Sequence, residues 1–308
     1  MIGRQRGFAL LVAMWILVAL SAISIHVGIE TRTLRGAAVN ALETTPAKLA
    51  AIAGVHTALA RIHAAARDDG FVRGTHVPGS GPANNAFSFL ISGHMVEVRL
   101  TDLTQRLNIN NATERQLALF LASSGVDTRD ASRMAQTIAD WRDSDAVPRA
   151  DGAEDEYYVP RGLSRLPSNG PIVTMAEVEH IRGMTKEVVD LLTEAATLWG
   201  SGRVNLSTAR PTVLLTVPGI TAEAVEVLLA DRGPQRQLYS LDQLAVRLSD
   251  PARTALHDHF DDALDATTWV ADEWLIESVA IRDGRTRWIA SGVVSLRSSR
   301  ASLYWLRA

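Results

Sequence analysis

An uncharged, apolar run from Phe8 to Ile29 constrains the fold of this chain more than any other feature. In a helix, a run of this length rises about 33 Å, which matches the hydrocarbon core of a bilayer. Arg4 and Arg6 precede the run and no acidic residue does. This charge bias predicts that the first residues stay in the cytoplasm and that residues 30–308 cross the membrane. The run therefore predicts a transmembrane helix.

Two simpler interpretations of this run stay open. One is a cleaved secretory signal, whose apolar region usually has about 7 to 15 residues and ends in a small-x-small site. The run here is longer, and Ala22-Ile23-Ser24 is a poor site of that kind. The other is a plain uncleaved anchor. The third interpretation depends on the residues at the start of the run.

The segment Gly7-Phe8-Ala9-Leu10-Leu11 resembles the processing site of type IV pilins and type II secretion pseudopilins. The resemblance implies that a prepilin peptidase cuts between Gly7 and Phe8 and that the new terminal amine is methylated. These families normally carry glutamate at the fifth mature position, where this chain has Val12. In the families the glutamate neutralises the terminal amine of the subunit ahead in the fibre.

Valine at this position has a physical interpretation. An unpaired carboxylate in an apolar bundle is costly, so a subunit with no neighbour ahead of it is more stable with Val12. Among pseudopilins, the chain resembles the K type, the large minor subunit at the tip of the pseudopilus.

Composition limits the classes of protein that the chain can form. With 308 residues, 47% of them apolar, it can bury a sizeable core and form two domains outside the membrane helix. The absence of cysteine excludes disulfides, thiolate zinc sites and cysteine nucleophiles. No phosphate-binding glycine-lysine loop, nucleophile elbow or HExxH zinc helix is present, so we expect no enzyme.

Strand patterns occur at both ends of the chain, and the middle is helical in pattern. Apolar residues three and four apart extend the first helix to Ala66. Alternating or β-branched segments predict strands at 86–90, 95–103, 274–282, 287–296 and 301–307. We expect an α+β fold, in which the long pseudopilin helix packs on one antiparallel sheet and a large all-α domain is inserted into that sheet.

The expected organisation has five parts. They are a leader at 1–7, a transmembrane helix at 8–29, a pseudopilin helix with the first strands at 30–104, an inserted α-helical domain at 105–268, and C-terminal strands at 269–308.

The inserted domain contains an internal repeat. Asn108-Ile109-Asn110-Asn111-Ala112 matches Asn205-Leu206-Ser207-Thr208-Ala209 at an offset of 97 residues. Both segments carry helix N-cap residues, and each is followed by a glycine-containing turn and a further helix pattern. Two related modules, 105–200 and 201–268, are therefore predicted.

The second copy, Val204 to Leu244, resembles the helix-hairpin-helix or SAM-like segments of DNA-uptake and repair proteins. The resemblance supplies the alternative function, a membrane-anchored DNA-binding protein. Such hairpins hold phosphate with backbone N–H groups at a helix N-terminus. Here Thr221 replaces the second glycine, Glu223 comes after it, and the first copy has Asp127 beside its turn. Because these acids repel phosphate, we favour a protein-binding role and expect no nucleic acid partner.

The segment 140–158 is an acidic loop with seven carboxylates and two arginines. Carboxylates at this density repel one another unless they are solvated or bind a cation, and a flexible loop of oxygen ligands favours Ca²⁺ over Mg²⁺. A solvated loop without an ion is the alternative. Val147 and Pro148 occupy positions that argue against a true EF-hand.

The acidic loop also resembles the calcium-binding loop of the K-type pseudopilins, from Asp140 through Tyr158. The resemblance implies that Ca²⁺ is bound by the carboxylates of Asp143, Asp145, Glu154 and Asp155, with Asp140 and Asp151 as weaker candidates. Trp141, Tyr157 and Tyr158 are interpreted as core anchors for the loop.

Together these features predict a non-enzymatic minor pseudopilin of a type II secretion system. It would be a single-pass inner-membrane protein, with its soluble part in the periplasm. The resemblance implies that it forms the pseudopilus tip with the I- and J-type minor pseudopilins and supports protein export. Contacts with the major pseudopilin, the secretin or the secreted cargo would result from that position.

Overall fold

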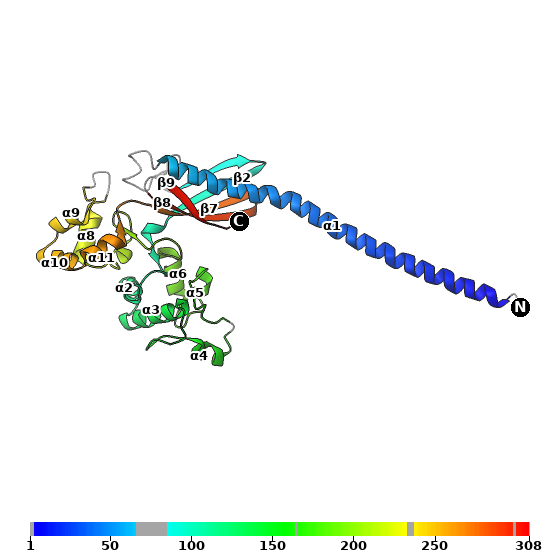
Figure 1. The fold of residues 1–308 in the computed structure, drawn as a ribbon, viewed down its shortest axis with the longest axis horizontal. Helices are drawn as coiled ribbons and strands as arrows, with labels where there is room; N and C mark the ends of the chain where they lie inside the picture. The colour runs from blue at the N-terminus through cyan, green and yellow to red at the C-terminus, as the bar shows by residue number, and fades with distance from the viewer. Residues whose placement is uncertain (1–2, 66–84, 164, 233–236, 298–299, 308) are drawn as a thin grey trace.

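The fold combines one long helix, one antiparallel sheet and a separate helical domain (Figure 1). A computed structural model describes the backbone of residues 3–65, 85–163, 165–232, 237–297 and 300–307. Within these ranges, the side chains of residues 3–12, 28–29, 31–43, 297, 300–301 and 304–305 are not described. The predicted mixture of helix and antiparallel sheet is confirmed.

Helix α1 runs from Gly3 to Ala65, and its two halves differ in their surroundings. The described side chains of residues 13–27 are exposed, and Figure 1 shows this half extending away from the rest of the molecule. The second half packs on the sheet through small residues such as Ala47, Ala51 and Ala58. Over the residues that the structure describes, no helix is long and apolar enough to cross a membrane.

Gly54 sets the closest approach of α1 to the sheet. A Cβ atom at this position would overlap Ser278 Oγ and lie 2.9 Å from Val96 Cγ1. Only glycine therefore lets the helix lie this near to the strands that carry Val96 and Ser278.

The five long strands form one antiparallel sheet, with order β1-β2-β7-β8-β9. Their bounds are β1 Ala86–Ile91, β2 His94–Asp102, β7 Glu273–Arg282, β8 Arg285–Arg297 and β9 Arg300–Arg307. Strand β2 pairs directly with β7, although 170 residues separate Asp102 from Glu273 in the sequence. Two strands that are neighbours in the sheet are thus separated in the sequence by the whole helical region.

The helical domain lies between β2 and β7 in the sequence. After the 3₁₀ turn η2 Leu103–Gln105, its helices are α2 Glu114–Ser123, α3 Thr128–Arg142, α4 Asp155–Tyr158, α5 Met175–Val178, α6 Lys186–Ala195, α7 Pro211–Leu214, α8 Ala222–Ala230, α9 Leu241–Val246, α10 Asp250–Asp258 and α11 Phe260–Ala266. A second 3₁₀ turn, η3 Val159–Arg161, comes directly after α4.

Each predicted module closes on itself through a pair of two-residue strands. In the first, β3 Leu107–Asn108 pairs in parallel with β4 Ala196–Thr197. In the second, β5 Val204–Asn205 pairs in parallel with β6 Thr267–Thr268. These strands are too short to leave a periodic signal in the sequence, which predicted helices alone for this region.

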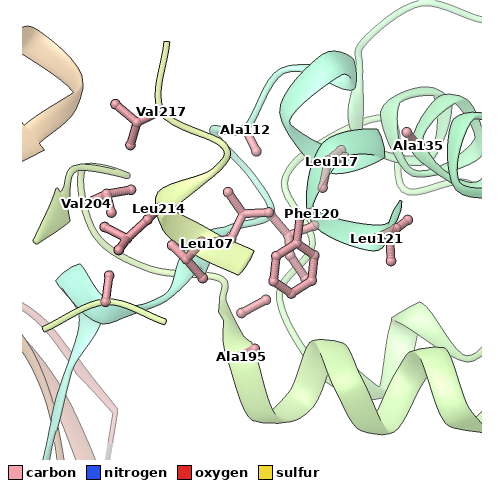
Figure 2. Close-up of a cluster of buried hydrophobic side chains, with 14 of the residues drawn as sticks. Leu107, Ala112, Leu117, Phe120, Leu121, Ala135, Ala195, Val204, Leu214 and Val217 are labelled. Atoms are coloured by element: carbon pink, nitrogen blue, oxygen red, sulfur yellow. The ribbon is translucent and has the colours of Figure 1, made fainter. Parts of the chain in front are cut away.

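The two modules share one hydrophobic core. Figure 2 shows Leu107 and Phe120 of the first module packed into the same cluster as Val204 and Leu214 of the second. A second, separate core lies between α1 and the sheet and includes the fully buried Val55 and Ile276. Sheet and helical domain are therefore stabilised by different cores.

Buried carboxylates lie where the helical domain joins the sheet. Asp102 accepts hydrogen bonds from Thr104 N (2.9 Å) and Gln105 Nε2 (3.0 Å), and burial raises its pKa to about 6. Glu273 Oε2 accepts from Ser201 N at 2.6 Å, which ties the start of β7 to the linker between the modules. Asp102 thus bonds to residues that directly follow β2, whereas Glu273 bonds to a residue between β4 and β5.

Candidate functional site

The acidic loop begins at the end of α3 and ends at the start of α4. Asp143 is the C-cap residue of α3, and its N–H donates to Ala139 O at 3.0 Å. Asp145 lies in the exposed loop and accepts from Val147 N at 2.9 Å. Glu154 is the N-cap residue of α4 and is only 2% exposed. Two helix ends and one turn thus fix the directions of these three side chains.

Asp143, Asp145 and Glu154 meet at one point. Each offers one carboxylate oxygen, and the three oxygens lie within 4.8 Å of one another. The other expected ligand, Asp155, is exposed in the first turn of α4 and lies outside this group. The structure therefore gathers three of the four expected ligands.

The two weaker candidates, Asp140 and Asp151, also lie outside this group. Asp140 is fully buried and accepts hydrogen bonds from Arg149 N and Arg149 Nη1. Asp151 is exposed, and its N–H donates to Gln136 Oε1 at 2.8 Å.

The carboxylate of Glu154 is buried without a hydrogen-bond donor among the described residues. Within the part of the chain that the structure describes, Asp143 Oδ1 also lacks one. Burial, and after it the charges of Asp140, Asp143, Asp145 and Asp155, raises the pKa of Glu154 to about 7. A buried carboxylate without a partner is unfavourable unless it is protonated or binds a cation.

Arg149 neutralises the inner part of the loop. Its Nη1 atom lies 2.5 Å from Asp140 Oδ1 and 2.6 Å from Asp143 Oδ2. These bonds, the one to Asp143 first, raise the pKa of the guanidinium above its usual value. Because Arg149 contacts only one oxygen of Asp143, this carboxylate can still contribute to the group with Asp145 and Glu154.

The residues present fit a calcium ion. Three carboxylates supply hard oxygen ligands, a loop supplies flexibility, and the orphaned oxygens of Glu154 and Asp143 supply unsatisfied acceptors. Asp143, Asp145 and Glu154 would hold the ion, which would cancel the repulsion among them and fix the end of α3 to the start of α4.

Aromatic residues anchor the loop in the core, as the sequence predicted. Trp141 and Tyr158 are buried and meet edge to face, with 5.5 Å between ring centroids. The Tyr158 hydroxyl accepts from Arg182 N at 3.0 Å, and Arg182 Nη1 donates to Gly152 O at 2.9 Å. Tyr157 is partly buried beside them. The loop is therefore held at both ends by the core of the first module.

Sequence reasoning missed Arg149 as the central partner of the loop. The sequence shows that Arg149 lies among seven acidic residues. The path of the loop decides which of these residues it contacts. Gly152 was missed for the same reason: a Cβ atom there would overlap the Asp140 carboxylate and lie 2.9 Å from Arg149 N.

The internal repeat is preserved in atomic detail. Asn108 Oδ1 accepts from Asn110 N at 2.9 Å, and Asn205 Oδ1 accepts from Ser207 N at 3.0 Å. The correspondence extends to partly buried arginines. Arg142 Nη2 donates to Ala112 O in the first module, as Arg232 Nη2 does to Ala209 O in the second.

The hairpin turns of the two modules present capped helix N-termini. Asp127 Oδ1 accepts from Arg129 N at 2.9 Å at the start of α3. Thr221 Oγ1 accepts from Ala224 N at the start of α8. Glu223 accepts from Ser249 N at 2.6 Å. N–H groups of the kind that hold a phosphate in a DNA-binding hairpin thus already have partners here.

The predicted processing site lies outside the described side chains. The backbone of Gly7 and Phe8 belongs to α1, but their side chains, and that of Val12, are among those not described.

Comparisons with known proteins agree with the resemblance seen in the sequence. A family model described as "Type II secretion system (T2SS), protein K" matches residues 98–201. The type II secretion system protein K of Klebsiella pneumoniae is 24% identical over 194 residues, which is 59% of each chain. That of Pectobacterium carotovorum subsp. carotovorum is 24% identical over 201 residues, or 60% of each chain. The chain thus spans about three fifths of the length of these relatives.

A solved structure has the same fold. A chain of the GspK-GspI-GspJ complex from the type 2 secretion system of enterotoxigenic Escherichia coli superposes with a TM-score of 0.64 at 14% identity. The superposition covers 90% of this chain and 98% of that one. The sequence comparisons thus confirm the resemblance to protein K of the type II secretion system, and the solved structure shows the same fold.

Proposed function

We propose that this chain is a non-enzymatic minor pseudopilin that forms the tip of a type II secretion pseudopilus. The observation that carries the proposal is the helical domain inserted between β2 and β7. The domain projects from the sheet beside the second half of α1 (Figure 1). A subunit that carries this bulk leaves little room for an identical subunit to stack above it, so it suits the end of a fibre.

The same proposal assigns the partners and the anchor. The superposed chain comes from a GspK-GspI-GspJ complex, and we propose the I- and J-type minor pseudopilins as partners here. The uncharged run from Phe8 to Ile29 supports insertion in the inner membrane. Cleavage after Gly7 and methylation of Phe8 are proposed from the sequence of the processing site.

Processing gives the most direct test. The full chain is co-expressed with a prepilin peptidase, and the mass of its amino terminus is measured. Loss of residues 1–7 together with the mass of one methyl group on Phe8 is the expected result. Retention of the first seven residues, or cleavage near Ser24, would rule out the pseudopilin assignment.

We also propose that Asp143, Asp145 and Glu154 bind Ca²⁺. The three convergent oxygens and the orphaned Glu154 carboxylate support this proposal. A ligand that binds only the folded state raises the unfolding midpoint. Thermal melting with Ca²⁺ should therefore give a higher midpoint than melting with a chelator, and Glu154→Gln should reduce the difference. An equal midpoint in both conditions contradicts the proposal.

A further inference from the structure

A groove lies between the two helical modules. Helix α2 of the first module forms one wall, and segment 215–221 with α10 and α11 forms the other. Its volume is ≈ 620 Å³, and a hollow of ≈ 380 Å³ continues it. The two share Gln116, Val217 and Asp262 among their lining residues. They form one continuous depression, which we call the intermodule groove.

One half of the intermodule groove is apolar. Leu119, on the outer side of α2, is 40% exposed there, while Val217 and Ile220 form part of the opposite lining and are nearly buried. Gln116 Nε2 donates to Thr216 O at 3.3 Å and so joins the two modules at the groove. An exposed leucine in a concave, mostly apolar lining is typical of a site that accepts an apolar side chain.

The other half of the intermodule groove is acidic. Asp262 and Asp265 line it, and both are solvent-accessible. They belong to segment 250–266, which carries five aspartates and one arginine. A partner that enters this half therefore meets a negative potential.

Two arginines and one histidine also line the intermodule groove. Arg203 lines the acidic half but lies 3.0 Å from Asp272 Oδ2 and donates to Thr267 O. Arg115 lines the apolar half. The Nδ1 atom of His259 lies 3.7 Å from Asp262. The charge of the acidic half thus favours a basic occupant.

We propose that the intermodule groove binds a peptide segment of a partner protein that places an apolar side chain against Leu119 and a lysine or arginine against Asp262 and Asp265. The apolar half supplies affinity through burial of a side chain, and the acidic half fixes the direction of the segment. Nucleic acid does not suit this surface, because its phosphates would lie against aspartates. This proposal is independent of the pseudopilus assignment.

The groove can be tested with peptides and the full chain in lipid nanodiscs. Random heptapeptides displayed on phage are selected on the immobilised chain, after counter-selection on empty nanodiscs. The expected result is enrichment of peptides that combine an apolar residue with lysine or arginine, and weaker binding of the enriched peptide at higher salt. Absence of enrichment, enrichment of peptides without a basic residue, or displacement of the peptide by duplex DNA overturns the proposal.

Paired variants locate the binding. The double variant Asp262→Lys/Asp265→Lys should weaken the enriched peptide about tenfold or more, and Leu119→Ser should weaken it through the apolar half. Matched controls on α8 are Glu226→Lys and Leu229→Ser, at positions that do not line the groove. Circular dichroism melts check that each variant is folded. If groove variants and controls bind the peptide equally, the proposed site is wrong.

Discussion

The two modules of the helical domain have the same framework but differ in the segment after their second helix. Both start with an asparagine-centred turn, and both place an arginine on a backbone carbonyl of that turn, Arg142 in the first and Arg232 in the second. After Arg142 the chain enters the acidic loop, whereas after Arg232 it reaches α9 at Leu241. The repeated contacts therefore maintain the fold, and the loop that differs carries the candidate site.

The first prediction, which has the largest expected effect on stability, concerns the packing of the acidic loop. Gly152→Ala should lower the free energy of unfolding by about 3 kcal/mol, because the new methyl group overlaps the buried Asp140 carboxylate. Urea denaturation measures the loss. Gly170→Ala in the same region is the control, since its nearest neighbour lies 3.7 Å away. Equal stability of the two variants would mean that the loop is not packed as described.

The second prediction tests whether the modules share one framework. Arg142→Ala and Arg232→Ala should each lower the free energy of unfolding by about 2 kcal/mol, because each leaves a backbone carbonyl without its donor. Denaturation curves of both variants give the comparison. If only one of the two variants lowers the free energy of unfolding, the repeated arginine contact does not stabilise both modules.

The third prediction uses pH to separate the acidic loop from the junction. Glu154 has a folded pKa of about 7 and Asp102 one of about 6, both above their ordinary values of 4.5 and 3.8. The folded state therefore binds these protons more tightly than the unfolded state does. Without divalent ions, stability should fall as pH rises from about 4.5 to about 7 for Glu154 and from about 4 to about 6 for Asp102.

Two variants test which carboxylates cause this pH dependence of stability. Glu154→Gln should remove the upper part of the slope and Asp102→Asn the lower part, as measured by thermal melting in chelator across pH 4 to 8. Added Ca²⁺ should reduce the part of the pH dependence of stability that is due to Glu154. It should leave the part that is due to Asp102 unchanged. A slope that neither variant changes would place the titrating groups elsewhere.

The smallest effects are expected at the hairpin caps. Asp127→Ala and Thr221→Ala should each lower the free energy of unfolding by about 1 kcal/mol, because each removes the side chain that accepts from an N-terminal N–H group. Neither change should create affinity for duplex DNA in a fluorescence titration. DNA binding that appears in Asp127→Ala would indicate that the aspartate masks a nucleic acid site.

Much of the fold was predictable because its signals are periodic and local. The alternation of Val96, Val98 and Leu100 with polar residues predicted one buried face, and β2 buries that face against α1. The five long strands lie within two residues of their predicted bounds. The four short strands β3 to β6 were missed, because two-residue strands depend on partners that are distant in the sequence.

The sequence by itself determined the long helix, the strands at both ends, the repeat and the acidic loop, because each depends on residue spacing within a short segment. Only the tertiary structure decided that Asp143, Asp145 and Glu154 converge while Asp155 lies outside their group, that Arg149 joins Asp140 to Asp143, and that the modules enclose a groove. These facts depend on how helix ends meet in space, and packing in the shared core sets that geometry.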